Sequence, residues 1–253
     1  MSHKVFQPML WPTLMAIPTL AVLVGLGVWQ LERLRWKSDL IETVEARVGL
    51  APVSFPGAHT WDNLDVSNWA FRPVVVRGRF DHSKRLYWFA QKAGGSVGFQ
   101  VITPLRLEGE GGGWVLVDRG FVTQNSRDPK VWTEGEPEGV VKIIGLARAS
   151  GVRSLFDPPD EPQNGLWFVR DSVAMGEALD LATVAPLFVD AERGSDSSSG
   201  VAPVPEGGQT PRHFRNAHLH YALTWFGLAV VLVGIYFVWH WQVGHMGRPR
   251  RVD

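Results

Sequence analysis

Residues 221–239, YALTWFGLAVVLVGIYFVW, contain no charged side chain and no histidine over 19 positions. A second stretch, residues 5–31, runs for 27 positions without a charge near the other end of the chain. About 20 apolar residues in a helix span the hydrocarbon core of a bilayer. We therefore expect one transmembrane helix toward each end of the chain.

Each segment has an alternative interpretation. Residues 5–31 could be a cleaved signal peptide, but an apolar run of this length favours an uncleaved anchor. Residues 221–239 could be a buried core helix, although an arginine-rich tail follows them. Tryptophans lie at or near the ends of both segments, as in an interfacial aromatic belt: Trp11, Trp29, Trp225, Trp239 and Trp241.

Two spans would place both termini on one side of the membrane and residues 32–220 on the other. Arg248, Arg250 and Arg251 indicate a cytoplasmic C-terminus by the positive-inside rule. Basic residues just after the first span argue the other way, but a long loop crosses regardless of its charge. No Arg- and Ser-rich leader precedes the first span. The expected location is thus a bacterial plasma (inner) membrane, with cytoplasmic termini and an extracytoplasmic central domain.

Between the spans the hydrophobic period changes from that of a helix to two. Strands are expected at residues 74–80, 84–89, 97–107, 114–122, 140–148, 167–171 and 185–189, and a short helix at 171–182. The first two strands should pair around a turn at 81–83, and Pro104 should interrupt the third. The predicted fold class is a membrane α plus extracytoplasmic β-rich (α+β) protein, in which two terminal transmembrane helices flank an antiparallel sheet or small open barrel.

The predicted organisation has seven parts. They are a cytoplasmic N-terminus (1–9), the first transmembrane helix (10–31), its helical extension (32–50), the β-rich domain (51–192), a Gly- and Ser-rich flexible loop (193–212), the second transmembrane helix with its interfacial start (213–241) and a basic cytoplasmic tail (242–253).

Composition excludes several classes of protein. The chain of 253 residues has 25 basic and 25 acidic side chains, so it lacks the positive charge of a nucleic-acid binder. The absence of cysteine excludes Cys-ligated zinc, iron–sulfur clusters and covalently attached c-type haem. No nucleophile elbow, P-loop or His-Glu-x-x-His motif is present. An enzyme is therefore not expected. The alternative that the chain is a membrane-tethered enzyme is supported only by the expected folded domain between the spans.

The start of the second span carries the most unusual side chains. In a helix, His218, Tyr221 and Trp225 would share one face, with Arg215 about one turn nearer to water. His220 would point roughly 200° away from His218, so the two imidazoles would not chelate one metal. A single imidazole on an aromatic face suits axial ligation of haem iron, with the arginine paired to haem carboxylates. The residues alone favour the simpler alternative that polar side chains end the span.

The outer end of the first span has a matching face, with Trp29, Arg33 and Trp36 at helical spacing. Small residues let membrane helices approach closely. Two pairs of them, Ala21 with Gly25 and Gly227 with Gly234, predict that the spans pack together with the Trp29 and His218 ends adjacent. Separate aromatic anchoring of each span is the alternative.

Three segments resemble motifs of the surfeit locus protein family (Surf-one), which comprises assembly factors of haem–copper cytochrome c oxidase. They are LGVWQLER at 26–33, VDRGFV at 117–122 and NAHLHYALTWF at 216–226. Asp118 stands where the family has Asn, and His220 stands where the family commonly has Gln. The resemblance covers nearly the whole chain.

The resemblance implies a non-enzymatic factor that binds haem a and promotes its insertion into cytochrome c oxidase subunit I. His218 is then the haem iron ligand, and the candidate cofactor-binding residues are His218, Tyr221, Trp225, Arg215, Trp29 and Arg33. The implied partners are subunit I, haem a synthase and membrane lipid, with no nucleic acid. The alternative is a cofactor-free scaffold that holds the large oxidase subunit during maturation. Arg119 and Gly120 would form either a docking edge or merely a tight strand end.

Overall fold

The computed structural model describes residues 9–92, 95–109, 112–128, 136–193, 205–208 and 216–246. The chain divides into two compact units. The helical unit comprises Met1–Thr43 and His213–Asp253, and the β unit comprises Val44–Arg212. Helix α1 (Leu10–Val48) runs without a break through the segment predicted as a helical extension.

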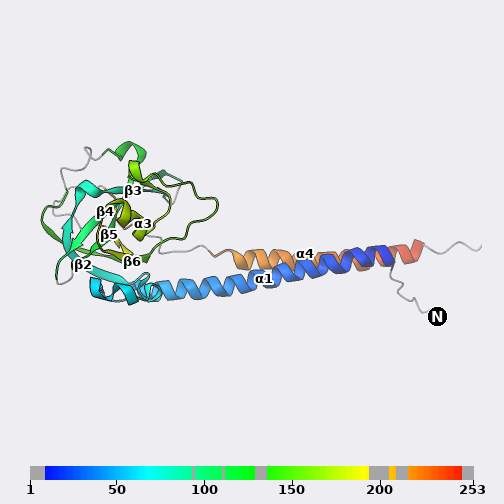
Figure 1. Cartoon of the computed structure of the whole chain (residues 1–253). Helices are drawn as coiled ribbons and strands as arrows, with labels where there is room; N and C mark the ends of the chain where they lie inside the picture. Colours follow the sequence, from blue (N-terminus) through cyan, green and yellow to red (C-terminus); the bar gives the residue numbers. More distant parts are fainter. Residues whose placement is uncertain are drawn as a thin grey trace, which may run out of the picture. The chain divides into compact units, whose positions relative to one another are not determined.

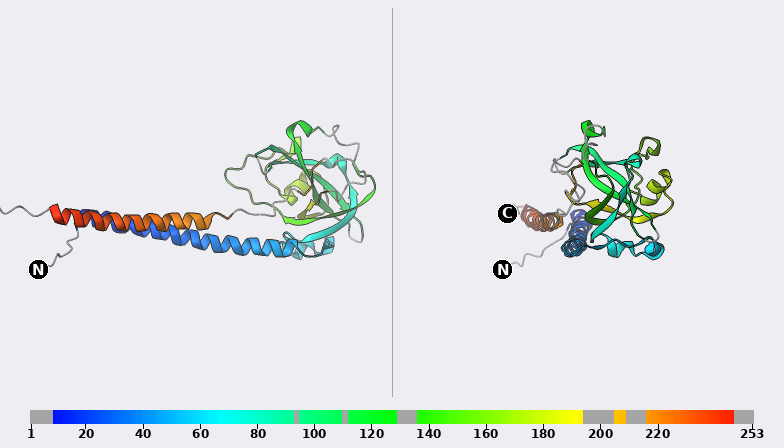
Figure 2. Two further views of the ribbon diagram at one scale, coloured as in Figure 1. Left: turned by 180° about the vertical axis from the view of Figure 1, so that it is seen from behind. Right: turned by 90° about the vertical axis from the view of Figure 1, so that its left-hand side faces the viewer.

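Helices α1 and α4 (His218–Met246) make up the helical unit and lie side by side in both views (Figures 1 and 2). Thr13 Oγ1 of α1 and the Tyr236 hydroxyl of α4 are 2.6 Å apart, which joins the helices near one end. Both helices are long and apolar enough to cross a membrane. Only 11% of each apolar window is buried, which does not fit a buried core helix. The prediction of two apolar terminal helices that pack together is confirmed.

The small residues that allow this packing differ from those predicted. A Cβ built on Gly25, Gly227 or Gly234 meets nothing within 4 Å, so the predicted stripes are not at the helix contact. Gly27 lies there instead, since its added Cβ would be 2.6 Å from the Phe226 ring. The buried residues Ala222 and Ala229 lie on the same helix as Phe226. The sequence could not choose between the stripes because both helices are apolar on every side.

Among the described residues of the β unit, eight strands form one sheet. They are β1 (Val53–Ser54), β2 (Pro73–Phe80), β3 (Leu86–Gln91), β4 (Val97–Leu107), β5 (Trp114–Thr123), β6 (Val140–Ala149), β7 (Leu166–Trp167) and β8 (Val184–Ala191). Their order is β1-β2-β6-β8-β5-β4-β3-β7, and an additional β2–β4 pairing joins β2, β6, β8, β5 and β4 into a closed barrel. The predicted β-rich domain between terminal helices is confirmed. The sheet is mixed, because β8 runs parallel to β5.

Inward-facing residues of the five barrel strands form the main core. Side chains at alternate positions of these strands point into the barrel. Many of the other side chains are buried too, as in β5, where Val115 to Val122 are all buried and Leu116 packs in a second cluster with Ile102 and Phe188. The fully buried core side chains include Val74, Val76, Leu105, Val115, Val117, Ile143, Leu187 and Val189. Trp61, from the 3₁₀ turn Ala58–Asn63, packs against the same core.

The predicted β2–β3 hairpin is wrong. Asp81 accepts a hydrogen bond from the Ser83 amide and starts the short 3₁₀ helix His82–Lys84, which separates the two strands. Both strands instead pair with β4, at Phe80↔Leu105 for β2 and at Leu86↔Ile102 for β3. The long strand β4 therefore pairs with both β2 and β3. Such a pairing between distant segments is not predicted by a turn motif.

Pro104 does not interrupt β4, contrary to the prediction. It pairs opposite Leu116, and its carbonyl accepts a hydrogen bond from the Asp81 amide. The irregularity in β4 lies between Gln100 and Ile102 instead.

Two further elements are shorter than predicted, and one predicted loop falls largely outside the described residues. Helix α3 is Ser172–Ala178, capped by the Asp171 carboxylate and ended where Asp180 adopts a φ of 52°. The strand predicted at 167–171 is limited to β7. Of the predicted loop at 193–212, the structure describes residues 193 and 205–208. The predicted N-terminal segment up to residue 8 and the tail from residue 247 also lie outside the described ranges.

Candidate functional site

The site begins with a hydrogen bond between the two helices. His218, the first residue of α4, has its Nδ1 atom 2.8 Å from Oε1 of Gln30 on α1. Asn216 caps the start of α4 by accepting from the His218 amide at 3.4 Å, and its side-chain amide donates to Ser38 of α1 at 3.3 Å. The histidine is thus held from both its backbone and its ring, against the neighbouring helix.

This hydrogen bond fixes the tautomer of the imidazole. The amide oxygen of Gln30 can only accept, so Nδ1 of His218 must carry the proton and donate. In the neutral form of the ring the lone pair is then on Nε2, and among the described residues no hydrogen bond to Nε2 is found. A neutral histidine with its outer nitrogen available, oriented through its other nitrogen, is the usual arrangement of a metal-ligating imidazole.

Gln30 is the residue of this site that pattern reasoning missed. In the sequence it stands only as one position of the segment at 26–33, and the predicted face of the first helix comprises Trp29, Arg33 and Trp36. An amide inside an apolar transmembrane stretch was the available signal, because such groups hydrogen-bond between helices. Which residue of the partner helix it meets depends on the rotation of two uniformly apolar helices, which no pattern sets.

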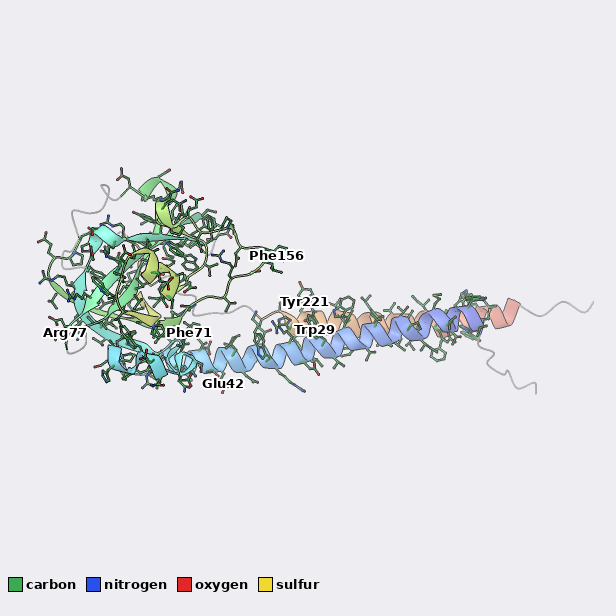
Figure 3. The ribbon with its side chains drawn as sticks, viewed as in Figure 1. Trp29, Glu42, Phe71, Arg77, Phe156 and Tyr221 are labelled. Carbon is green, nitrogen blue, oxygen red and sulfur yellow. The ribbon has the colours of Figure 1, made fainter. Side chains whose placement is uncertain are left out.

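The predicted aromatic residues lie beside the histidine but are largely uncovered. Tyr221 is 54% exposed and Trp29 is 53% exposed, at the same end of the helix pair (Figure 3). Trp225 is half-buried. The Arg33 guanidinium lies 4.0 Å from the centroid of Trp36. On α4, Tyr221 and Trp225 follow His218 at i+3 and i+7, so these two aromatic side chains share its face of the helix.

Two other predicted features can be placed less fully. His220 is exposed, and its ring contacts that of Tyr221 with centroids 6.3 Å apart. Only His218 of the two hydrogen-bonds to α1, as the predicted angular separation requires. Arg215 lies outside the described residues.

A buried ionic cluster underlies the 117–122 segment of the β unit. Arg170 Nη2 donates to Asp190 at 2.6 Å, and Arg170 Nη1 lies 3.7 Å from Asp118. Burial raises the pKa of Asp118 from 3.8 to about 7, nearby Asp190 adds to the rise, and Arg170 opposes it. The cluster borders a cavity of about 260 Å³, also lined by Gln100. It can retain a proton near neutral pH.

Gly120, in the same 117–122 segment, lies close to the backbone of Glu206. Its φ is 128°, and an added Cβ would lie 2.2 Å from the carbonyl carbon of Glu206. Phe121 and Glu206 exchange backbone hydrogen bonds at 3.0 and 3.1 Å. The edge beside Gly120 is therefore covered by residues 205–208 of this chain. Gly120 lies within β5, which continues to Thr123, and glycine is required there by its positive φ and by the close backbone of Glu206.

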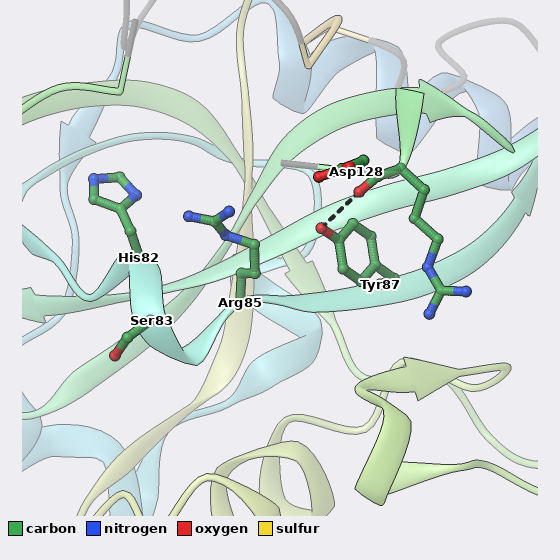
Figure 4. A pocket seen from close by; sticks show the side chains of 6 residues that line it. His82, Ser83, Arg85, Tyr87 and Asp128 are labelled. Atoms are coloured by element: carbon green, nitrogen blue, oxygen red, sulfur yellow. Dashed lines mark hydrogen bonds between the residues drawn. The ribbon is translucent and has the colours of Figure 1, made fainter. Parts of the chain in front are cut away.

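A larger pocket of about 690 Å³ lies elsewhere on the β unit (Figure 4). His82, Arg85 and Arg127 are among its lining residues. Glu136 lies 2.9 Å from Arg85 and 3.4 Å from His82. Burial raises the pKa of Glu136, but the hydrogen bond from His82 and the charges of Arg85 and Arg119 lower it below its usual value overall. The ion pairs show that part of the positive charge at this pocket is already neutralised.

Comparison with known proteins bears on both units. The profile described as "SURF1 family" matches residues 17–230. Surfeit locus protein 1 of Homo sapiens is 36% identical over 239 residues, which cover 88% of this chain and 75% of the human protein. The Xenopus tropicalis protein of the same name is 36% identical, covering 81% and 67%. A SURF1-like protein of Drosophila melanogaster is 30% identical, covering 91% and 76%.

Proposed function

Because this chain belongs to the SURF1 family of cytochrome oxidase assembly factors, we propose that it binds haem a through His218 and promotes insertion of the haem into subunit I of cytochrome c oxidase. The family is generally non-enzymatic. The proposed role is accordingly that of a carrier, with haem a synthase as the source of the cofactor and subunit I as its destination.

The observation that carries the proposal is the 2.8 Å hydrogen bond between His218 Nδ1 and Gln30 Oε1. It supports ligation because it leaves Nε2 of a neutral imidazole for the iron. Bound haem would supply the metal centre, and this chain would supply a single imidazole, that of His218, to hold the iron. A carrier held by one ligand can still release its cofactor, whereas two strong ligands would oppose transfer.

The surroundings of His218 suit the remaining parts of haem a. Tyr221, Trp225 and Trp29 would contact the ring, and Arg33 and Arg215 would pair with its carboxylates. Exposed apolar side chains continue along α4, as at Val230 and Ile235, which are 71% and 61% exposed. The long hydrocarbon substituent of haem a would lie along such a surface within the bilayer.

We also propose that the chain resides in a bacterial plasma membrane with both termini in the cytoplasm. The arginines at 248, 250 and 251 support this orientation. A phosphatase reporter that is active only after export tests it. The reporter should be active when inserted after residue 151 and inactive when fused after residue 253, and the reverse pattern would contradict the orientation.

The test of haem binding compares His218→Ala with His220→Ala, purified as full chains from a host that makes haem a. We expect the first variant to lose bound haem and the second to retain it, by the pyridine haemochrome spectrum. Equal haem content in wild type and His218→Ala would rule out the proposed ligand. Comparable helix content and membrane yield would exclude misfolding as the cause.

A second experiment separates the carrier from a cofactor-free scaffold. In a host that cannot make haem a, a scaffold should still co-purify with the haem-free subunit I. A carrier that binds subunit I only when it holds haem a should not co-purify with the subunit in this host. Co-purification at an unchanged level would favour the scaffold.

A further inference from the structure

One loop of the β unit holds large apolar side chains almost fully exposed. Val152 is 93% exposed, Leu155 is 99% exposed and Phe156 is 94% exposed. We refer to these three side chains as the apolar tip. They follow β6 in the chain, and Figure 3 shows Phe156 pointing away from the barrel. Three large exposed apolar residues within five positions are uncommon on a surface that contacts only water.

The polar groups of this loop bond within the loop. The Arg153 guanidinium donates to the Pro158 carbonyl at 2.8 Å and pairs with Asp160. The Ser154 amide donates to the Asp157 carboxylate at 2.6 Å, and the Asp157 amide returns a bond to the Ser154 carbonyl at 3.2 Å. Some of the backbone hydrogen bonds of this loop are therefore made within the loop and not to water. The apolar side chains, by contrast, point outward.

The loop is also pre-organised. The Gly151 amide donates to the Arg170 carbonyl at 2.7 Å, which fixes its first residue to the body of the unit. Pro158 and Pro159 restrict the backbone after the tip. Asp160 accepts from the Phe168 amide at 2.7 Å, which fixes the far end. Little conformational entropy would be lost when such a loop enters another environment.

We propose that the apolar tip inserts into the interfacial region of the lipid bilayer that holds this chain. Each end of the β unit continues in the chain toward an apolar helix long enough to span a membrane, so the bilayer is present at a high effective concentration. The Arg153–Asp160 pair reduces the cost of bringing these charges near lipid. The backbone groups that are bonded within the loop need fewer water partners in the polar interfacial region of the bilayer.

Lipid suits these features better than a protein partner does. A protein surface usually recognises a loop through polar contacts as well as apolar ones. Here Arg153 and the Ser154 amide bond within the loop, whereas Val152, Leu155 and Phe156 are the parts left outward. The inference does not depend on haem binding by His218.

The test uses the full chain reconstituted in vesicles of phosphatidylcholine and phosphatidylglycerol. The chain contains no cysteine, so a single Leu155→Cys substitution carries one environment-sensitive dye. Lipids with a spin label near the headgroup then quench a dye that reaches the interface. The control is the same dye at Val173→Cys, a 58% exposed position on α3.

We expect at least threefold more quenching at position 155 than at position 173. Adding Val152→Ser and Phe156→Ser should remove most of that difference while leaving the near-ultraviolet circular dichroism of the chain unchanged. Equal quenching at 155 and 173, or quenching at 155 that is insensitive to the serine substitutions, would overturn the proposal. A dye response that requires added oxidase subunit would also overturn it and assign the tip to a protein partner.

Discussion

Nδ1 of His218 lies 2.8 Å from Oε1 of Gln30, although 188 positions separate the two residues in the chain. The bond both joins α1 to α4 and selects which imidazole nitrogen carries the proton. A residue of the first helix thereby determines the chemistry of a side chain on the second.

Replacing Gln30 with Leu should weaken haem binding about tenfold or more, because the ring of His218 loses the acceptor that orients it. The affinity should be measured by titration of haem into the purified full chain, together with the electron paramagnetic resonance spectrum of the ferric complex. The spectrum should broaden or shift as the ring loses its fixed orientation.

Gln30→Glu is the matched control, since its carboxylate can still accept from Nδ1. We expect this variant to bind haem more tightly than Gln30→Leu. If both variants bound haem equally and gave the wild-type spectrum, Gln30 would have no role in positioning the ligand.

Gly27→Val should separate the helices locally, because an added Cβ would lie 2.6 Å from the Phe226 ring. The expected cost is about 1–3 kcal/mol, typical of overpacking a close contact. Thermal unfolding of the full chain in detergent and haem retention should both decrease.

Gly25→Val controls for the loss of a glycine from the same helix, since its Cβ meets nothing within 4 Å. A second substitution, Phe226→Ala, should partly restore the Gly27→Val chain. Equal effects of the two valine variants would contradict the Gly27–Phe226 contact.

These contacts show where sequence reasoning succeeds and where it fails. The spans and most barrel strands follow from apolar runs and period-two alternation, which are local properties of the chain. The partner of a membrane helix face is not local. Ala21 and Gly25 were as plausible from spacing as Gly27, because lipid-facing and helix-facing positions are equally apolar.

Strand pairing in the barrel shows the same limit of sequence-based prediction. The segments of β2 and β3 were predicted, but their pairing was not, because the turn at Asp81 does not fold the chain into a hairpin. Both strands pair with β4, and β8 joins β5 and β6 from far along the chain. Pairings between distant strands depend on the whole core, so short motifs do not specify them.

Gly120→Ala should destabilise the β unit strongly. Its φ of 128° strains any other residue, and the new Cβ would lie 2.2 Å from the backbone of Glu206. Gly109→Ala isolates the strain, since Gly109 has a φ of 110° but nothing within 4 Å. We expect about 1–3 kcal/mol for Gly109→Ala and roughly 2 kcal/mol more for Gly120→Ala. Tryptophan fluorescence during urea unfolding measures both, and similar losses would show that Glu206 does not cover Gly120.

Asp118 should make stability depend on pH. Burial raises the pKa of Asp118 from 3.8 to about 7, so the folded protein keeps a proton that the unfolded chain has released. The contribution of this group to stability therefore decreases as pH rises from about 4 to about 7, and stays low above that range.

Asp118→Asn should remove this dependence and raise the free energy of unfolding at pH 8 by on the order of 1–3 kcal/mol. Asn retains the oxygen that accepts from the Gly120 amide at 3.0 Å, so the local backbone is preserved. Melting temperatures between pH 5 and pH 8.5 give the comparison. Parallel profiles for the two proteins would mean that Asp118 ionises as an ordinary carboxyl group.

The position of β8 in the barrel has a consequence for biosynthesis. Strands β5 and β6 are consecutive in the described sheet elements, yet β8 (Val184–Ala191) lies between them. A nascent chain that has been synthesised only as far as β6 consequently has two unpaired strand edges and no closed barrel. A premature stop codon before residue 184 should therefore yield a product that cannot fold and is degraded, however complete its first membrane anchor.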